Sequence, residues 1–226
     1  MCMRVVAVVP SYEEEQFVGE TVRSLSAIEE VDSVLVVDDN SSDRTADTAV
    51  DEGARVVVNS PNLGKGNSLN RILPHVDFDV LLLVDGDIGS SASEASTLLE
   101  PVLSGEADLA IAKFPSPELR GGFGLAQGLA RCGIERLTGR RMESPLSGQR
   151  ALTREVYSRT SPFEAGFGVE VGMTVDTISS GFRVVEVETK MSHKESGRDL
   201  HGFIHRGRQF TDILRVLVKR SFTRGR

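Results

Sequence analysis

The sequence predicts an α/β fold built on a mostly parallel, doubly wound sheet. Short β-branched apolar runs alternate along the chain with amphipathic helical stretches. These runs are nearly continuous in apolar residues, which is typical of strands buried on both faces. The chain has 226 residues, of which 39% are hydrophobic, so it is long enough to form one large core. We therefore expect right-handed strand–helix–strand units in a single domain.

The regular part of the pattern covers the first 115 residues. Strands are expected over residues 4–9, 33–37, 54–58, 79–84 and 108–113. Helices are expected over residues 14–28, 43–52, 65–73 and 93–103. In the first helix Phe17, Val22 and Leu25 share one face. The Ser41-Ser42-Asp43 cluster is expected to cap the second helix, because short oxygen-bearing side chains satisfy the backbone amides at a helix start.

The second half is less regular but continues the same domain. Helices are expected over 121–139 and 168–180, a turn or strand edge over 145–151, and a strand over 182–189. We divide the chain into an α/β half (1–115), a second half of the same domain (116–200) and a basic amphipathic tail helix (201–226). We expect this tail helix either to dock on the body of the domain or to lie on an anionic lipid surface.

Composition excludes several classes of protein. The net charge is −7, but residues 191–226 carry nine Lys/Arg and three Asp/Glu, so the rest of the chain carries −13. That balance argues against a nucleic-acid-binding protein. Even the longest apolar runs, such as residues 80–84, are far too short to span a bilayer, and no signal peptide is expected. Two cysteines without a CxxC pattern favour a reducing, cytoplasmic location, with peripheral membrane contact left open.

The most informative motif follows the most apolar strand. Asp85-Gly86-Asp87 comes directly after DVLLLV, and ligands of open α/β sheets bind beyond the carboxyl ends of strands. If this segment is extended, both carboxylates face the same way. Paired oxygens of this kind suit Mg²⁺ or Mn²⁺, which share their remaining positions with phosphates and water.

Two further candidates have less specific patterns. Lys65 stands in a Gly-Lys-Gly turn that opens a helix, which suits an anion or a nucleobase edge as well as it suits an ordinary loop. His193 follows the last predicted strand and can complete a metal site that the two aspartates leave open.

Four motifs, in order and spacing, resemble the GT-A-type nucleotide-sugar glycosyltransferases of family 2. They are VVPSYEEEQFVGETVRSL, VVDDNSSDRT, NLGKGNSL and VDGDI. In the second half GRR, PLSGQRA and FGVEVGMTVD are similar to the glucosyl-3-phosphoglycerate synthase branch, whose members are longer than this chain. Tyr12 and Glu13 replace a smaller Leu-Asn-like pair of that branch. The Q-x-x-R-W motif of processive synthases is missing, so a polysaccharide-extruding enzyme is not expected.

The resemblance implies roles for individual residues. Residues implied to bind the nucleotide-sugar donor are Pro10, Tyr12, Glu14, Asp39, Lys65 and Asp85. Asp87 and His193 would ligate Mg²⁺ or Mn²⁺, and Glu170 would hydrogen-bond the donor sugar. Residues implied to lie near the acceptor are Gly139, Arg140 and Gly148, where an arginine suits a phosphate or carboxylate.

We therefore expect a metal-dependent hexosyltransferase, with Asp85, Asp87 and Glu170 as its catalytic residues. UDP-glucose is the first candidate donor and GDP-mannose the second, and the acceptor is a small phosphorylated or carboxylated molecule such as phosphoglycerate. The stereochemical outcome stays open: Glu170 or Asp176 could act as the base of an inverting route, and the phosphoglycerate branch retains configuration.

Three alternatives remain at this point. The first is transfer to a polyprenyl phosphate at a membrane surface. The second is a sugar-1-phosphate nucleotidyltransferase, although the Gly-rich loop of that class is absent after the first predicted strand. The third is a non-catalytic nucleotide-binding module. The sequence also leaves open whether the chain forms a homodimer.

Overall fold

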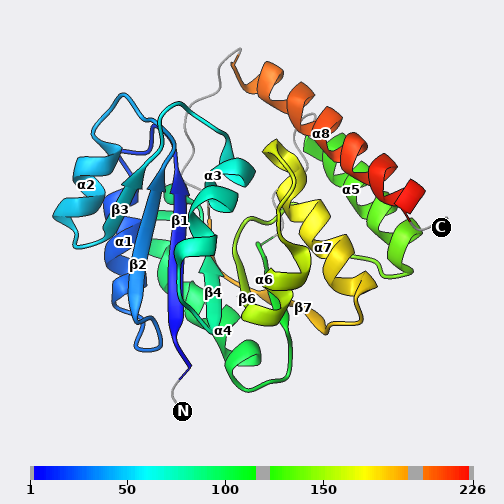
Figure 1. The fold of residues 1–226 in the computed structure, drawn as a ribbon, viewed down its shortest axis with the longest axis horizontal. Helices are drawn as coiled ribbons and strands as arrows, with labels where there is room; N and C mark the ends of the chain where they lie inside the picture. Colours follow the sequence, from blue (N-terminus) through cyan, green and yellow to red (C-terminus); the bar gives the residue numbers. More distant parts are fainter. Residues whose placement is uncertain (1–2, 116–122, 193–200, 224–226) are drawn as a thin grey trace.

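A computed structural model describes residues 3–115, 123–192 and 201–223. One seven-stranded sheet, ordered β3-β2-β1-β4-β6-β5-β7, lies between two layers of helices (Figure 1). The strands are β1 (Val5–Ser11), β2 (Ser33–Asp38), β3 (Arg55–Val58), β4 (Val80–Leu83), β5 (Leu109–Lys113), β6 (Arg150–Thr153) and β7 (Val184–Glu188). Only β6 runs antiparallel to its neighbours, so the sheet is mostly parallel, as predicted.

The α-helices are α1 (Val18–Ser26), α2 (Thr45–Asp51), α3 (Lys65–Ile72), α4 (Ser96–Leu103), α5 (Phe123–Thr138), α6 (Arg154–Thr160), α7 (Val169–Ser179) and α8 (His201–Thr223). Among the described residues there are also three 3-10 segments, namely η1 (Leu73–His75), η2 (Gly86–Ala95), which is kinked at Gly89, and η3 (Gly166–Gly168). Each predicted strand and helix of the first half is present, with ends shifted by a few residues.

The sheet separates two hydrophobic cores because successive side chains of a strand point to opposite faces. In β1, Val5, Ala7 and Val9 pack in the core formed with α1, η2 and α4. Val6 and Val8 pack in the other core, which receives side chains from α3, α5, α6, α7 and α8. Burial on both faces explains why the predicted strands read as continuous apolar runs.

Three details differ from the prediction. The 145–151 segment was expected to be a turn or strand edge, but Arg150 begins β6, which lies inside the sheet between β4 and β5. Helix α6 was not predicted; it starts where Thr153 Oγ1 accepts a hydrogen bond from the Val156 amide. The predicted cap of α2 is confirmed in part: Asp43 Oδ1 accepts a hydrogen bond from the amide of Thr45, the first residue of the helix, at 2.9 Å, whereas Arg44 occupies the cap position and makes no side-chain cap bond.

The tail forms α8, which packs along α5 and contacts α7 and η3 (Figure 1). Ile213, Val216 and Leu217 are buried against the body. A Cβ atom at Gly133 of α5 would lie 2.3 Å from Leu217, so the two helices approach closely. Over its described side chains, α8 is therefore a docked helix. Within the ranges that the structure describes, no helix combines the length and apolar character needed to cross a membrane.

Candidate active site

The site lies where the order of the strands reverses. The chain runs outward from β1 through β2 to β3 and then returns to place β4 on the other side of β1. The carboxyl ends of β1 and β4 therefore meet at a topological switch point, which is where open α/β sheets bind ligands. Ser11 ends β1, and Asp85 follows β4.

Gly86 lets these two strand ends approach closely. A Cβ atom at position 86 would lie 2.5 Å from Ser11 Oγ and 3.4 Å from Glu14 Cγ, so a side chain there would fill the space. Ser11 is 5% exposed, and its hydroxyl has no hydrogen-bond partner among the described residues. A buried polar atom without a partner is costly, so it marks a position where a ligand or water can bind.

The expectation of an extended Asp85-Gly86-Asp87 segment is wrong beyond its first residue. Asp85 has extended backbone angles (φ −70°, ψ 150°), but Gly86 begins the 3-10 helix η2 and Asp87 lies in its first turn. The two carboxylates are therefore displayed by different backbone conformations. Both side chains remain partly exposed at the same strand end.

Lys65 connects two carboxylates that are far apart in the sequence. Its Nζ lies 2.7 Å from Asp85 Oδ1 and 2.8 Å from Glu170 Oε1. The three side chains come from the start of α3, the end of β4 and the first turn of α7. Their exposed fractions are 25%, 26% and 10%, so water screens these contacts only in part. Three residues predicted to bind the donor thus form one cluster, the Lys65–Asp85–Glu170 cluster.

The electrostatics of this cluster keep Lys65 charged. Burial alone would lower the pKa of Lys65, but the carboxylates of Asp85 and Glu170 outweigh burial and raise the pKa well above its ordinary value. An ammonium group has three N–H donors, and these two carboxylates use two of them. A third donor therefore remains for a ligand.

The loop before β6 closes the cluster from the other side. Gln149 Nε2 donates to Asp85 Oδ2 at 2.9 Å, so protein donors engage both oxygens of Asp85. At Gly148 a Cβ atom would lie 2.3 Å from Asp85 Oδ2 and 2.8 Å from Lys65 Nζ. Gly148, predicted near the acceptor, is thus in direct contact with the cluster. Any larger residue at this position would displace Asp85 or Lys65.

Arg150 holds this loop in place. Its side chain is fully buried and donates to the Ser147 carbonyl at 2.8 Å, the Pro145 carbonyl at 3.4 Å and Thr174 Oγ1 at 2.9 Å. Burial lowers the pKa of Arg150 to about 10, against the opposing effect of nearby carboxylates. The guanidinium is still protonated at neutral pH, and it joins the loop to α7.

Helix α3 carries Lys65 and is fixed by a close backbone contact. A Cβ atom at Gly66 would lie 2.0 Å from the Glu164 carbonyl oxygen, so only glycine fits there. The Glu164 side chain in turn binds Arg220 Nη1 at 2.8 Å and Lys219 Nζ at 2.9 Å, both on α8. Arg220 also donates from Nε to Asp176 Oδ1 at 2.7 Å. Asp176, one of the two candidate bases, is therefore engaged by α8.

Asp39 is the centre of a second buried network. Its Oδ1 accepts hydrogen bonds from Asn59 Nδ2 at 2.9 Å and from Ser68 Oγ at 2.6 Å. The Leu63 amide donates to Oδ1 at 2.9 Å, and the Gly64 amide donates to Oδ2 at 2.6 Å. Burial would raise the pKa of Asp39, but these four hydrogen bonds outweigh it and hold the pKa below its ordinary value. Asp39 thus fixes the loop that leads into Lys65.

This network predicts an acid-sensitive loop. We expect Asp39→Asn to lower the unfolding free energy at pH 7 by about 1–3 kcal/mol, because buried amides lose a charged acceptor. A lowered pKa stabilises the folded state above the unfolded pKa of about 4, and the effect disappears as the pH falls further. Urea denaturation from pH 7 to pH 3 should therefore show the gap between the two proteins closing. Asp51→Asn, at an exposed position of α2, is the control. A gap that is constant down to pH 3 contradicts the assignment.

The loop after β1 is tied to the loop after β2. The Glu13 amide donates to Ser41 Oγ at 2.9 Å, and Glu13 Oε1 accepts from the Ser42 amide at 2.7 Å. The Glu14 amide donates to Thr45 Oγ1 at 2.8 Å. The residues expected to cap α2 thus shape the loop that carries Tyr12, which is 52% exposed. Pro10 lies within β1 opposite Val37 of β2, so Pro10, Tyr12 and Glu14 all lie at the switch-point end of the sheet.

The two residues predicted near the acceptor at the end of α5 have structural contacts. Gly139 has φ +74°, a left-handed conformation that glycine adopts readily at a helix end. The guanidinium of Arg140 donates to the Val184 carbonyl of β7, so this side chain is held against the sheet. Arg131, Arg141, Glu143 and Glu186 instead line a cavity of about 410 Å³ beside this turn.

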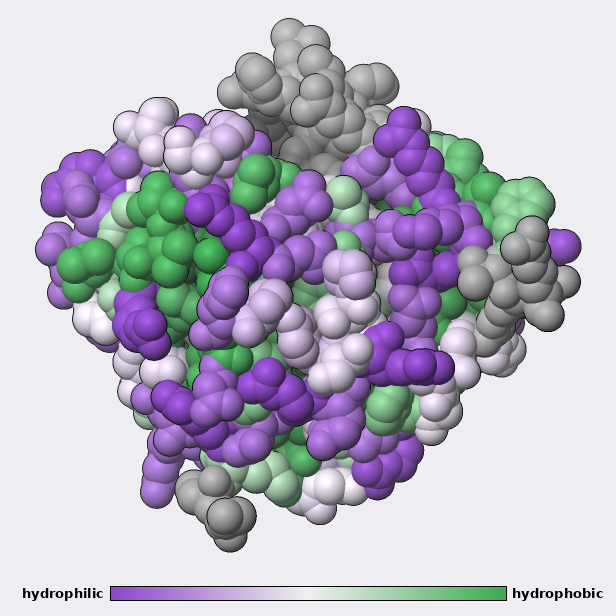
Figure 2. Space-filling view, viewed as in Figure 1, coloured by the Kyte–Doolittle hydropathy of each residue, from purple (hydrophilic) through white to green (hydrophobic). Residues whose placement is uncertain are grey.

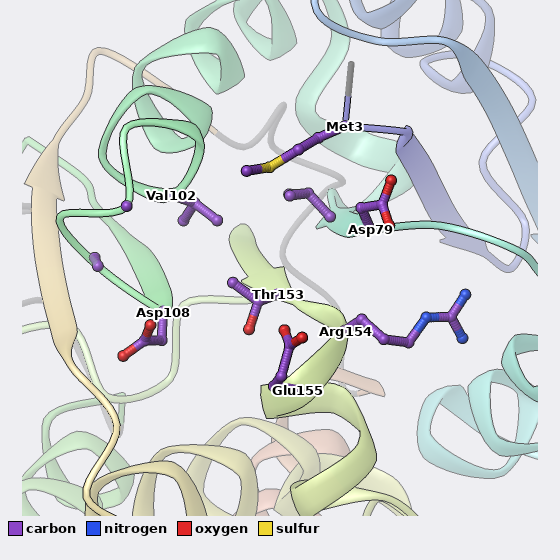
Figure 3. Close-up of a pocket in the computed structure, with 10 residues that line it drawn as sticks. Met3, Asp79, Val102, Asp108, Thr153, Arg154 and Glu155 are labelled. Atoms are coloured by element: carbon purple, nitrogen blue, oxygen red, sulfur yellow. The ribbon is translucent and has the colours of Figure 1, made fainter. Parts of the chain in front are cut away.

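A second cavity, of about 320 Å³, lies at the opposite end of the sheet. Figure 3 shows Met3 and Val102 on its wall and Asp108 and Glu155 at its edge, with the guanidinium of Arg154 pointing away. It opens near the amino ends of the strands, far along them from Asp85. It is therefore separate from the switch-point site.

Comparison with known proteins identifies the family. A profile described as "Glycosyl transferase family 2" matches residues 6–145, which is more than half of the chain. This chain belongs to glycosyl transferase family 2. The match extends beyond the four motifs and includes the whole of α5 and the turn that follows it.

Two curated relatives cover most of this family 2 chain. Glycosyltransferase AglJ of Haloferax volcanii is 30% identical over 198 residues, covering 84% of this chain and 63% of AglJ. Glucosyl-3-phosphoglycerate synthase of Mycolicibacterium paratuberculosis is 32% identical over 195 residues, covering 75% of this chain and 58% of the synthase. The chain thus spans about three-fifths of the length of these relatives.

Solved structures show the same architecture. Glucosyl-3-phosphoglycerate synthase from Mycobacterium tuberculosis in complex with Mg²⁺ and UDP has a TM-score of 0.80 and 26% identity, covering 96% of this chain and 79% of that chain. Its complex with Mn²⁺, UDP-glucose and phosphoglyceric acid has a TM-score of 0.79 and 27% identity, with the same coverage. The GT-A fold and the resemblance to the synthase branch are confirmed.

The donor set at the switch point of this family 2 chain fits a divalent cation. Lys65 and Gln149 engage both oxygens of Asp85, and the partly exposed side chain of Asp87 lies at the same strand end. His193, the second predicted ligand, lies outside the described residues, which contain no group of three His, Cys, Asp or Glu side chains able to hold a metal. A site with few protein ligands suits Mg²⁺ or Mn²⁺ that also binds a diphosphate.

Sequence reasoning missed three residues of this family 2 site. Gln149 and Arg150 stand in the PLSGQRA motif, but nothing in a sequence of seven letters shows that their side chains turn toward Asp85 and α7. Ser11 stands in the first of the four motifs, where no role was assigned to it. The available signal was the resemblance of PLSGQRA to the synthase branch, because Gln149 and Arg150 both stand in that motif.

Proposed function

We propose that this chain is a metal-dependent glycosyltransferase that moves one hexose from a nucleotide sugar to a small phosphorylated or carboxylated acceptor. The Lys65–Asp85–Glu170 cluster at the switch point, beside Asp87, is the observation that carries this proposal. UDP-glucose is the first donor to test and GDP-mannose the second. Phosphoglycerate is the first acceptor to test, because the synthase structures with which this chain shares its fold contain it.

The arrangement suits binding of the donor at the carboxyl ends of β1 and β4. Tyr12 and Pro10 offer apolar contact for the base, and Glu14 lies beside them near the base and ribose. Asp39 would support the base through the loop that its four hydrogen bonds fix. Glu170 is mostly buried and directed at Lys65, so it is placed to accept hydrogen bonds from sugar hydroxyls. The free third N–H of Lys65 is available to the diphosphate or the sugar.

The reaction breaks the C1–O bond of the sugar, and the nucleoside diphosphate leaves with the electron pair. A new C1–O bond forms to the acceptor hydroxyl, whose proton is lost. A bound Mg²⁺ or Mn²⁺, held through Asp87 and His193, would neutralise charge that develops on the diphosphate. Glu170 is a better candidate than Asp176 for a group near C1, because Arg220 engages both carboxylate oxygens of Asp176, whereas Lys65 engages only Oε1 of Glu170. Whether the anomeric configuration is inverted or retained is read from the product.

Mass-spectrometric product detection tests the proposal directly. UDP-glucose and GDP-mannose are each incubated with phosphoglycerate and with a polyprenyl phosphate, with and without Mn²⁺. We expect a hexosyl product that depends on Mn²⁺. Neither product nor donor hydrolysis under any condition would identify a binding module instead, and release of pyrophosphate from a sugar-1-phosphate and a nucleoside triphosphate would identify a nucleotidyltransferase.

One observation favours a lipid-phosphate acceptor as the second candidate. Phe210, Leu214, Val218 and Phe222 recur every four residues along α8 and are 39%, 44%, 45% and 75% exposed. Figure 2 shows hydrophobic side chains at the upper right edge, where α8 lies in Figure 1. Arg215 and Lys219 beside this row are 81% and 68% exposed. An apolar row with flanking cations suits the surface of an anionic membrane.

A point substitution tests this surface without undocking α8. We expect Leu214→Glu to abolish cosedimentation with phosphatidylserine vesicles, because it places a carboxylate in the apolar row. Ser221→Glu changes the net charge equally at an exposed position outside the row and should cosediment as the wild type does. If the wild type itself stays in the supernatant, the membrane candidate fails and the small acceptor remains.

A further inference from the structure

The cavity beside the end of α5 has a wall of two arginines and two glutamates. Arg131 comes from α5, Arg141 and Glu143 from the turn that follows it, and Glu186 from β7. Its volume of about 410 Å³ is enough for a small organic anion. Of these four residues, only Arg141 stands in a motif of the sequence analysis, GRR, and it was given no role there.

Both glutamates are already engaged by the protein. The Glu186 carboxylate accepts hydrogen bonds from the Glu143 amide at 3.0 and 2.9 Å and from the Ser144 amide at 2.6 Å. Glu143 Oε2 lies 2.6 Å from Lys113 Nζ. The pKa of Glu143 is lowered by the hydrogen bond from Lys113 and by the charge of that lysine, with smaller effects of Arg131 and Arg141. These acids therefore shape the turn and have their own cationic or amide partners.

The two arginines, unlike the glutamates, keep N–H donors that no described residue uses. Arg131 donates from Nε to the Met142 carbonyl at 3.1 Å and from Nη2 to the Glu143 carbonyl at 2.9 Å, which fixes its guanidinium at the cavity wall. Within the described ranges, Nη1 of Arg131 and all of the Arg141 guanidinium make no hydrogen bond. Arginine donors that are held in place but not used suit a phosphate or a carboxylate, which they can bind in pairs.

One short segment of chain connects the cavity lining to the Lys65–Asp85–Glu170 cluster. Glu186 binds the Ser144 amide at one end of the loop, and Gln149 binds Asp85 at its other end. Between them Arg150 holds the Pro145 and Ser147 carbonyls, and the carboxylates of Glu170, Glu186 and Asp85 all act on its guanidinium. The segment from Ser144 to Gln149 therefore joins a residue of the cavity wall, Glu186, to a residue of the cluster, Asp85.

We propose that Arg131 and Arg141 bind the anionic group of the acceptor, a phosphate or carboxylate on a small molecule. This inference rests on the proposed glycosyl transfer. It assigns the acceptor anion to Arg141 rather than to Arg140, whose guanidinium is held by the Val184 carbonyl. An acceptor anchored in the cavity is adjacent to the loop that contacts Asp85 and Lys65, so its hydroxyl can be directed at the donor sugar.

Titration calorimetry with phosphoglycerate, and separately with inorganic phosphate, tests the assignment. We expect Arg141→Gln to weaken phosphoglycerate binding by about 10- to 100-fold, since one charge-assisted contact is lost. If the phosphate of phosphoglycerate is the anchored group, Arg141→Gln should also weaken the binding of inorganic phosphate. If the carboxylate is the anchored group, inorganic phosphate should not bind the wild type. Arg136→Gln removes an exposed guanidinium of α5 that does not line the cavity and should bind as the wild type does.

Binding of UDP with Mn²⁺ in the same variants separates the two proposals. Arg141→Gln should leave UDP affinity unchanged, and in transfer assays it should raise the acceptor KM more than it lowers kcat. Wild-type phosphoglycerate affinity in Arg141→Gln and in Arg131→Gln, with normal UDP binding, overturns the acceptor assignment alone. Absence of UDP and nucleotide-sugar binding in the wild type overturns the proposed function itself.

Discussion

Replacing Asp87 by alanine is expected to reduce sugar transfer by about 10²–10³-fold, because charge on the leaving diphosphate loses its main stabilising group. The chain should remain folded. Asp87 lies in the first turn of η2 and is partly exposed, so the unfolding free energy should change by no more than about 1 kcal/mol. Transfer rates with Mn²⁺ and urea denaturation of the same preparation measure both effects.

A binding experiment distinguishes the metal role of Asp87 from a general defect. Mn²⁺ should increase the affinity of the wild type for UDP and have little effect on Asp87→Ala. Asp51→Ala, which removes an exposed carboxylate on α2, is the matched control and should respond to Mn²⁺ as the wild type does. Equal Mn²⁺ dependence in Asp87→Ala and the wild type would remove Asp87 from the metal site.

Replacing Lys65 by methionine should affect both activity and stability. The methionine keeps most of the side-chain volume but removes the cation that Asp85 and Glu170 share, so two partly buried carboxylates lose their counter-charge. We expect the unfolding free energy to fall by about 1–3 kcal/mol, less than for a fully buried pair because water screens part of the contact. Transfer should be lost because Asp85 and Glu170 are no longer held together.

The pH dependence and a second substitution check this explanation. A raised pKa stabilises the folded state below the unfolded pKa of about 10.4 and loses that effect as the pH rises toward the folded pKa. The stability gap between wild type and Lys65→Met should be constant from pH 6 to pH 9 and narrow above about pH 10. Glu170→Gln should lower the unfolding free energy less in the Lys65→Met background than in the wild type. Strict additivity would show that the two residues are not coupled.

The fold could be predicted from the sequence because its strands are buried on both faces. Runs such as residues 80–84 have no polar face, and the structure buries them on both sides of the sheet. The helices between them do have a polar face, and the spacing of their apolar residues matches their burial on one side. The central strand β6 was missed for the opposite reason. It has four residues and begins with Arg150, a charged residue that the structure buries completely. A sequence alone gives no sign that Thr174 and two carbonyls will satisfy that guanidinium.

The candidate site could be predicted in part. Lys65, Asp85 and Glu170 were each assigned to the donor through resemblance, but their mutual contact joins residues up to 105 positions apart and depends on the packing of α3 against α7. The acceptor side was less predictable. Arg140 and Arg141 are adjacent and chemically identical, and only the turn after α5 decides which of them is held by β7.

Glu164 gives the molecule a mechanical link that affects how it can be engineered. Its carbonyl oxygen contacts the first turn of α3, which carries Lys65, and its carboxylate forms ion pairs with Lys219 and Arg220 near the end of α8. A graft or tether that displaces α8 is therefore expected to displace Glu164, the residue that contacts the helix of Lys65. Attaching this protein to a support through α8 is therefore expected to change its turnover rate.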